Sequence, residues 1–212
     1  MNGLVNKVWF FGASNTTYWN KAHPGTNTYI NWLERTPKHF TELLSKKLNL
    51  ILINKGIDSI DNYTIFETIL KNINDIDIND KIVVDWVSIL RFRVVDNNKF
   101  KTIISTDKLN EIPFLSKNTM DEILINRDSV LYVNEVIYWS KILKKIFKNN
   151  IIFWSVFEEF KNNSNILYMN ASVSNFNILN ETNGYINDFH LGEVGHIELA
   201  NRLYSKFLNN II

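Results

Sequence analysis

The sequence has 212 residues, of which 45% are hydrophobic and 21% are charged, and its formal net charge is +1. This length and composition predict one globular domain spanning residues 1–212, and the near-neutral charge gives no broad positive field for nucleic acid. The chain contains no cysteine, which excludes disulfide bonds, thiolate metal sites and cysteine nucleophiles.

Short β-rich runs alternate with longer segments of helical periodicity along the chain. The predicted core strands cover residues 5–11, 50–54, 81–87 and 151–156. The predicted helices cover residues 37–48, 63–73, about 128–148 and 194–208. Strands joined in this way by crossover helices predict an α/β fold with a mostly parallel sheet of four to five strands.

Two stretches, residues 17–34 and 91–126, fit no predicted core element. The first is rich in Tyr, Trp, Asn and Gly, and the second carries scattered charges. In a doubly wound sheet such insertions gather over the carboxyl ends of the strands, where ligands bind. We expect them to form pocket walls, with Trp19, Tyr29 and Trp32 as candidate substrate contacts. The alternative is that these aromatic side chains only pack an irregular surface segment.

The first predicted strand ends at the turn Gly12-Ala13-Ser14-Asn15-Thr16. A serine at the carboxyl end of a strand faces the crevice above the sheet, and Ser14 is therefore a candidate nucleophile. A serine hydroxyl is a poor nucleophile until a base removes its proton. Because no Gly-Lys-Ser/Thr follows, the turn is not a phosphate-binding loop.

A candidate acid and base precede the last predicted helix, in the segment Asp188-Phe189-His190. Residues two apart on an extended segment project to the same side, so the Asp188 carboxylate can reach Nδ1 of His190 and leave Nε2 available. Asp188 and His190 would complete a triad with Ser14. We assign His196, in the following Gly-His pair, a structural role. The four histidines form no ligand-spaced cluster with carboxylates, so neither a metal nor another cofactor is expected.

The serine after the first strand, combined with Asp188-x-His190-Leu-x-x-x-Gly-His196 before the last helix, resembles the SGNH (GDSL-type) hydrolases. The resemblance spans the whole chain and implies a three-layer α/β/α, flavodoxin-like fold. It also implies Ser14, Asp188 and His190 as the catalytic triad. The sequence departs from the family pattern in two places: Ala13 replaces the usual Asp, and Asp188 lies two rather than three residues before His190.

The resemblance implies an oxyanion hole formed by the Ser14 N–H, a backbone N–H after the second strand and a side chain after the third. Either Gly56 or Ser59 could supply the second donor, and we favour Ser59 because it is nearer the start of the following helix. After the third strand the family Gly-x-Asn-Asp is absent, and Ser88 is the candidate for the side-chain donor. A branch of the family carries a Trp, a hydroxyl residue and a downstream Arg at this place.

These residues predict a serine esterase that hydrolyses a small-molecule or glycan ester through an acyl-enzyme. The candidate substrate-binding residues are Trp19, Trp86 and Arg91, and the aromatic insertion favours an O-acetyl carbohydrate. An acyltransferase using the same triad is an alternative, as is a non-catalytic carbohydrate-binding or virion-associated module with a degenerate site. No signal peptide or membrane span is visible, so a cytoplasmic location is the default expectation. The oligomeric state cannot be derived from the sequence.

Overall fold

The computed structural model of the chain describes residues 6–19, 24–89, 91–96, 99–103, 129–172 and 174–209. Its centre is a parallel sheet of five strands in the order β2-β1-β3-β6-β7. The strands are β1 (Lys7–Phe11), β2 (Ile51–Asn54), β3 (Lys81–Asp85), β6 (Ile151–Ser155) and β7 (Ile166–Tyr168). In order along the chain this is the 2-1-3-4-5 arrangement of flavodoxin-like sheets. The predicted α/β fold class is confirmed.

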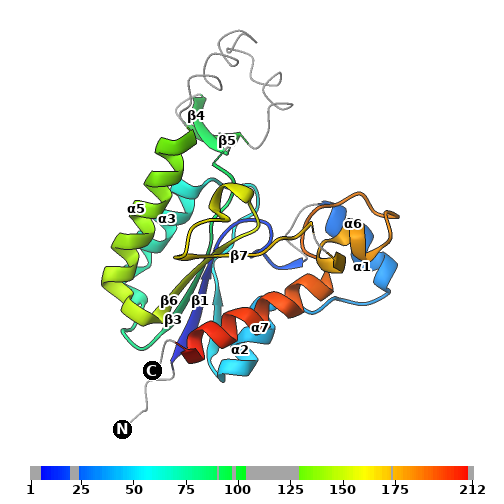
Figure 1. Cartoon of the computed structure of the whole chain (residues 1–212), viewed down its shortest axis with the longest axis horizontal. Helices are drawn as coiled ribbons and strands as arrows, with labels where there is room; N and C mark the ends of the chain where they lie inside the picture. Colours follow the sequence, from blue (N-terminus) through cyan, green and yellow to red (C-terminus); the bar gives the residue numbers. More distant parts are fainter. Residues whose placement is uncertain are drawn as a thin grey trace.

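Helices cover both faces of the sheet (Figure 1). One face packs against α2 (Phe40–Leu48) and α7 (Glu193–Asn209), and the other packs against α3 (Asn62–Lys71) and α5 (Ser129–Phe147). Successive side chains of β1 alternate between the two faces of the sheet. Phe10 packs in the core beneath α2 and α7, and Phe11 packs in the core beneath α3 and α5. Burial on both faces explains why the strands are continuous apolar runs in the sequence.

The remaining described elements lie in the connections between these core elements. The helices are α1 (Pro24–Leu33) and α6 (Ile178–Glu181), with short 3-10 turns at Ile73–Asp75, Lys148–Asn150, Glu158–Phe160 and Ser174–Phe176. An antiparallel hairpin consists of β4 (Phe92–Asp96) and β5 (Lys99–Ile103). The predicted insertion at 17–34 thus contains a helix, and the one at 91–126 begins with a hairpin. Residues 104–126 of that insertion lie outside the described residues.

The strand order places three loops beside one another at the carboxyl end of the sheet. Because β1 lies between β2 and β3, the turn after β1 is flanked by the loops that follow those two strands. The Lys55 N–H donates to Phe10 O at 2.8 Å, and the Ile57 N–H donates to Gly12 O at 3.0 Å. The loop after β2 is therefore held along the turn after β1, at the edge where a doubly wound sheet binds its ligands.

Candidate active site

The side chains of Ser14, His190 and Asp188 form one hydrogen-bonded chain beyond the carboxyl end of β1. His190 Nε2 lies 2.8 Å from Ser14 Oγ, and His190 Nδ1 lies 2.6 Å from Asp188 Oδ1. The Asp188 side chain is 6% exposed and that of His190 is 24% exposed. A carboxylate at Nδ1 fixes the tautomer that leaves Nε2 able to accept the Ser14 proton.

The turn that carries Ser14 is built from local hydrogen bonds and a close approach to the neighbouring strand. Ala13 O accepts the N–H groups of Thr16 and Thr17, both at 2.9 Å. Gly12 permits this turn to lie against β3, because a Cβ at this position would be 2.5 Å from Cβ of Asp85. The glycine at position 12 is therefore required by the packing of the turn.

The segment carrying Asp188 and His190 is fixed by its own backbone. His190 O accepts the Ile178 N–H at 2.9 Å, and Asp188 O accepts the Leu179 N–H at 2.8 Å. Between the acid and the base, Phe189 points away and is 69% exposed, which is the alternation expected of an extended segment.

Asn15 joins this segment to the nucleophile turn. Its Oδ1 accepts the N–H of Leu191, the residue after the base, at 3.1 Å. Asn15 adjoins Ser14 in the sequence, so one side chain ties the turn of Ser14 to the segment of His190. Asn15 was not singled out from the sequence.

The loop after β2 contains the two candidates for a backbone oxyanion donor. The Gly56 N–H donates to Asn54 Oδ1 at 2.8 Å, and Asn54 Nδ2 donates to Thr16 O at 2.7 Å. Within the described part of the chain, the Ser59 N–H has no acceptor. Ser59 also has a backbone φ of 60°, in the left-handed region that non-glycine residues seldom adopt. Because the Gly56 N–H already has an acceptor, Ser59 remains the candidate donor of this loop.

A buried asparagine places the loop that carries Ser88. Asn62, the first residue of α3, donates through Nδ2 to Val87 O and accepts the Val87 N–H at Oδ1, both at 2.8 Å. This reciprocal pair fixes the residue before Ser88 against the end of the loop that carries Ser59. On the other side, the Ile89 N–H donates to a carboxylate oxygen of Glu159 at 3.0 Å.

Arg91 lies beside the loop that follows β2, with Nη1 donating to Ile60 O at 3.3 Å. Burial lowers its pKa, while the carboxylates of Asp85, Asp58 and Asp61 act in the opposite direction. Arg91 is thus a partly buried cation among acidic side chains at this end of the sheet.

The two tryptophans predicted to bind substrate lie in the protein interior. Trp86 is fully buried, its ring stacks on Phe153, and its Nε1–H donates to Ser140 Oγ at 2.9 Å. Trp19 is 7% exposed and packs against Tyr29. Because neither indole has a face open to a ligand, both are omitted from the proposed site. Trp32 is another candidate substrate contact from the insertion at residues 17–34. It is 43% exposed.

The buried histidines His39 and His196 lie beside the segments that carry Ser14 and His190, with ring centroids 4.4 Å apart. Burial lowers the pKa of His39 to about 3, against the opposing effect of the carbonyls of Asn15 and Thr17. Burial and the neighbouring His39 also lower the pKa of His196, which lies beside the Leu191 carbonyl. Both rings are therefore neutral near pH 7, and they contact the backbone of the nucleophile turn and of the base segment.

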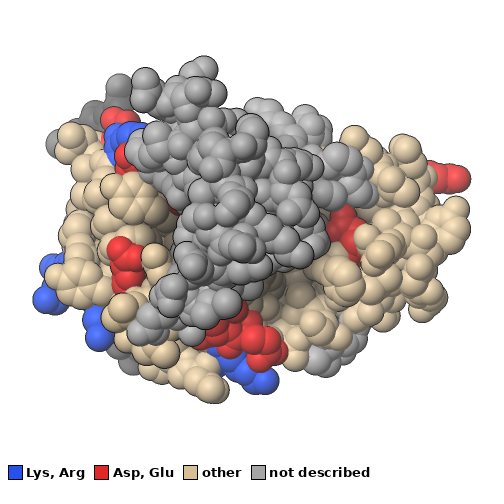
Figure 2. Space-filling view, turned by 90° about the horizontal axis from the view of Figure 1, so that it is seen from above, with Lys and Arg blue, Asp and Glu red and all other residues tan. Residues whose placement is uncertain are grey.

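The described residues contain no group of three or more His, Asp or Glu side chains placed to hold a metal ion. No described helix is long and apolar enough to cross a membrane. Around the residues drawn in grey, Figure 2 shows the visible acidic and basic side chains of the described residues scattered over the surface.

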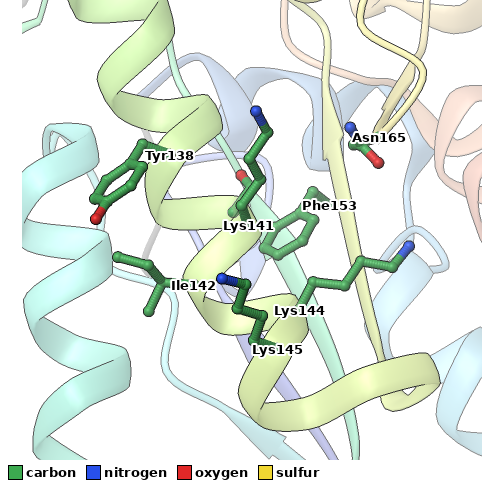
Figure 3. A pocket seen from close by; sticks show the side chains of 8 residues that line it. Tyr138, Lys141, Ile142, Lys144, Lys145, Phe153 and Asn165 are labelled. Carbon is green, nitrogen blue, oxygen red and sulfur yellow. The ribbon is translucent and has the colours of Figure 1, made fainter.

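A cavity of about 340 Å³ lies along α5, away from the triad (Figure 3). Lys141, Lys144 and Lys145 come from α5, and Phe153 from β6. None of the predicted site residues lines this cavity.

Comparisons with known proteins give one structural likeness. No protein-family profile and no curated protein matches the sequence. A solved structure from Desulfitobacterium hafniense DCB-2, of a protein provisionally described as a lipolytic protein of the G-D-S-L family, aligns over 95% of this chain and 99% of its own. The sequence identity is 11% and the TM-score is 0.41. The proposed function therefore rests on the geometry of the site.

Proposed function

We propose that this chain is a serine hydrolase that cleaves ester bonds through an acyl-enzyme. The observation that carries the proposal is the continuous contact from Asp188 through His190 to Ser14. In this mechanism His190 accepts the Ser14 proton as Oγ attacks the ester carbonyl, and Asp188 stabilises the resulting imidazolium. His190 then donates that proton to the leaving alkoxide.

Hydrolysis of the acyl-enzyme follows the same path with water as the nucleophile. His190 accepts a proton from the water, the hydroxide oxygen bonds to the acyl carbon, and Ser14 leaves with the proton returned by His190. In both steps the N–H groups of Ser14 and Ser59 and the hydroxyl of Ser88 are the proposed donors to the tetrahedral oxyanion. Arg91 remains a candidate substrate-binding residue.

The substrate class is proposed only as an ester. A glycan ester is expected from the sequence because Trp and Tyr side chains of the insertion at 17–34 could stack on sugar rings, but Trp19 and Tyr29 are buried. Trp32, which is 43% exposed, is the remaining candidate for such stacking.

The test is hydrolysis of p-nitrophenyl acetate by the wild type and by Ser14→Ala and His190→Ala. We expect either substitution to lower kcat by at least about a thousandfold, because the triad acts as a unit. Ser45→Ala is the matched control. Ser45 is 9% exposed, close to the 8% of Ser14, but its hydroxyl donates to Leu50 O at the opposite end of the sheet. Equal rates in all four proteins would contradict the proposal.

A fluorophosphonate probe tests the nucleophile directly. Mass spectrometry should locate one adduct on Ser14 in the wild type and in Ser45→Ala, and none on position 14 in Ser14→Ala. Product analysis with a sugar alcohol as acceptor then distinguishes acyl transfer from hydrolysis. Glycan binding without an adduct or acyl release would instead favour a non-catalytic module.

A further inference from the structure

Asp85, the last residue of β3, is a buried carboxyl group that the proposed mechanism does not use. It is 1% exposed and lies directly under the nucleophile turn. Its Oδ2 accepts the hydroxyl of Thr16 at 3.1 Å. Its Oδ1 is buried and has no hydrogen-bond partner among the described residues. Burying a carboxylate with so few partners is costly, so the position calls for a physical reason.

Asp80, just before the same strand, is a natural comparison because it is also 1% exposed. Its carboxylate accepts three N–H donors: the Lys7 backbone at 2.7 Å, the Trp9 indole at 2.8 Å and the Asp77 backbone at 3.0 Å. Asp80 has the partners expected of a structural carboxylate at the amino end of the sheet. Asp85 has fewer partners and lies at the end that carries the candidate site.

The groups that face Asp85 belong to the loops of that site. Burial raises the pKa of Asp85 to about 7, and the Thr16 hydroxyl, the Arg91 guanidinium and the Ala13 N–H act in the opposite direction. Ala13 and Thr16 flank the nucleophile, and Arg91 binds Ile60 O next to Ser59. The Asp85 carboxylate therefore holds a hydrogen bond from the nucleophile turn, and its charge interacts at longer range with Arg91, which is hydrogen-bonded to the loop of Ser59.

We propose that Asp85 is a positioning residue, which fixes the nucleophile turn through its hydrogen bond with Thr16 and, at longer range, attracts the Arg91 guanidinium that is hydrogen-bonded to the loop of Ser59. It touches no reacting atom. Its effect is to hold Ser14 Oγ and the proposed oxyanion donor at a constant separation, and a misplacement of about 1 Å can cost about a hundredfold in rate. This inference rests on the proposed function for its catalytic consequence, whereas the ordering of the two loops can be measured without activity.

The test compares Asp85→Asn with Asp80→Asn. Each substitution keeps the side-chain size and replaces one buried carboxyl group with an amide, Asp80 at the amino end of β3 and Asp85 at its carboxyl end. Asp85→Asn should lower kcat by about ten- to a hundredfold with KM within about twofold, and it should speed hydrogen–deuterium exchange in residues 11–19 and 55–61. Asp80→Asn should lower thermal stability but leave kcat and exchange in these two segments as in the wild type.

Thr16→Val provides a second variant that keeps the shape of the side chain and removes only its hydroxyl. It should speed exchange in residues 11–19 and lower kcat by about three- to tenfold, given the net contribution of one hydrogen bond. Thr16→Ser, which keeps the hydroxyl, should restore both quantities. If Asp85→Asn fails to fold, this pair decides the question.

Three outcomes would overturn the inference. They are unchanged exchange in both segments of Asp85→Asn, an equal loss of kcat in Asp80→Asn, and wild-type exchange in Thr16→Val. If the wild type shows no ester turnover, or turnover that is unchanged in Ser14→Ala, the proposed hydrolase function is contradicted. The exchange comparison would still decide whether Asp85 orders the two loops.

Discussion

The left-handed backbone of Ser59, with a φ of 60°, gives a test of the proposed oxyanion donor. Ser59→Gly keeps the N–H and removes the strain of a side chain in the left-handed region, which is about 1–2 kcal/mol. Glycine also loses more conformational entropy on folding, which costs about 0.5–1 kcal/mol. We expect wild-type kcat and a free energy of unfolding that is equal or slightly higher. The measurements are ester hydrolysis and urea unfolding.

Ser59→Pro is the contrasting variant at the same position. Proline has no N–H and fixes φ near −65°, so the donor is lost and the turn must change. We expect kcat to fall by about a hundred- to a thousandfold, as for the loss of one oxyanion donor. Ser59→Ala, which retains both the N–H and the strain, is the control. Wild-type turnover by the proline variant would remove Ser59 from the site.

At the scale of residues, the candidate site residues that could be predicted from the sequence are those marked by their spacing from nearby residues or by the end of a strand. Asp188 and His190 lie two apart on an extended segment, and Ser14 follows a buried strand, so each position had a local signal. Asn15 and Asn62 had none. Each binds the backbone of a segment distant in the sequence, and a polar side chain does not reveal which distant backbone it will meet.

At the scale of elements, α1 is joined to the amino end of α7 through Tyr29. The Tyr29 hydroxyl donates to Glu181 at 2.6 Å and accepts the Glu193 N–H at 2.8 Å. The Glu193 carboxylate in turn binds Arg35 and the Lys38 N–H. These contacts fix the start of α7, which directly follows the segment of the proposed base.

Tyr29→Phe should therefore destabilise the protein by about 1–3 kcal/mol, because it leaves a buried helix N–H and a half-buried carboxylate without their partner. Urea unfolding measures the change. Tyr185→Phe is the matched control, since Tyr185 is 77% exposed, and its effect should stay within about 0.5 kcal/mol. A loss no larger in Tyr29→Phe than in this control would mean that the Tyr29 contacts contribute little.

The core elements were predictable because parallel strands buried on both faces form apolar runs, and their crossover helices have a clear period. The strand predicted at 81–87 ends at Asp85 because the Val87 N–H donates to the Asn62 side chain. The edge strand β7 has three residues, too few to show an alternating pattern. The helix α1 was missed because aromatic and polar residues dominate its sequence, Pro24–Leu33.

At the scale of the whole molecule, buried titratable groups should make the free energy of unfolding depend on pH. The pKa of His39 is about 3 in the folded protein and about 6.5 when unfolded, so unfolding takes up a proton between these values. His39 therefore contributes stability that is fully present above pH 6.5 and is lost as the pH falls toward 3. The slope approaches about 1.4 kcal/mol per pH unit.

Asp85 acts with the opposite sign, because its folded pKa of about 7 lies above its ordinary value of 3.8. Its burial costs stability as the pH rises from 3.8 through 7. Between pH 4 and 7, the slope of the free energy of unfolding against pH should be more negative in His39→Asn than in the wild type, and more positive in Asp85→Asn. Parallel curves for all three proteins would show that neither group titrates as described.

The order of the triad along the chain has a consequence during synthesis. Ser14 and His190 are 176 residues apart, and β1 lies at the centre of the sheet. At about 5–20 residues per second, a ribosome completes the serine roughly 10–35 seconds before the histidine. Throughout that interval the nascent chain carries the hydroxyl without its base. The proposed activity can therefore arise only after His190 has been added to the chain and the last strands and helix have joined the sheet.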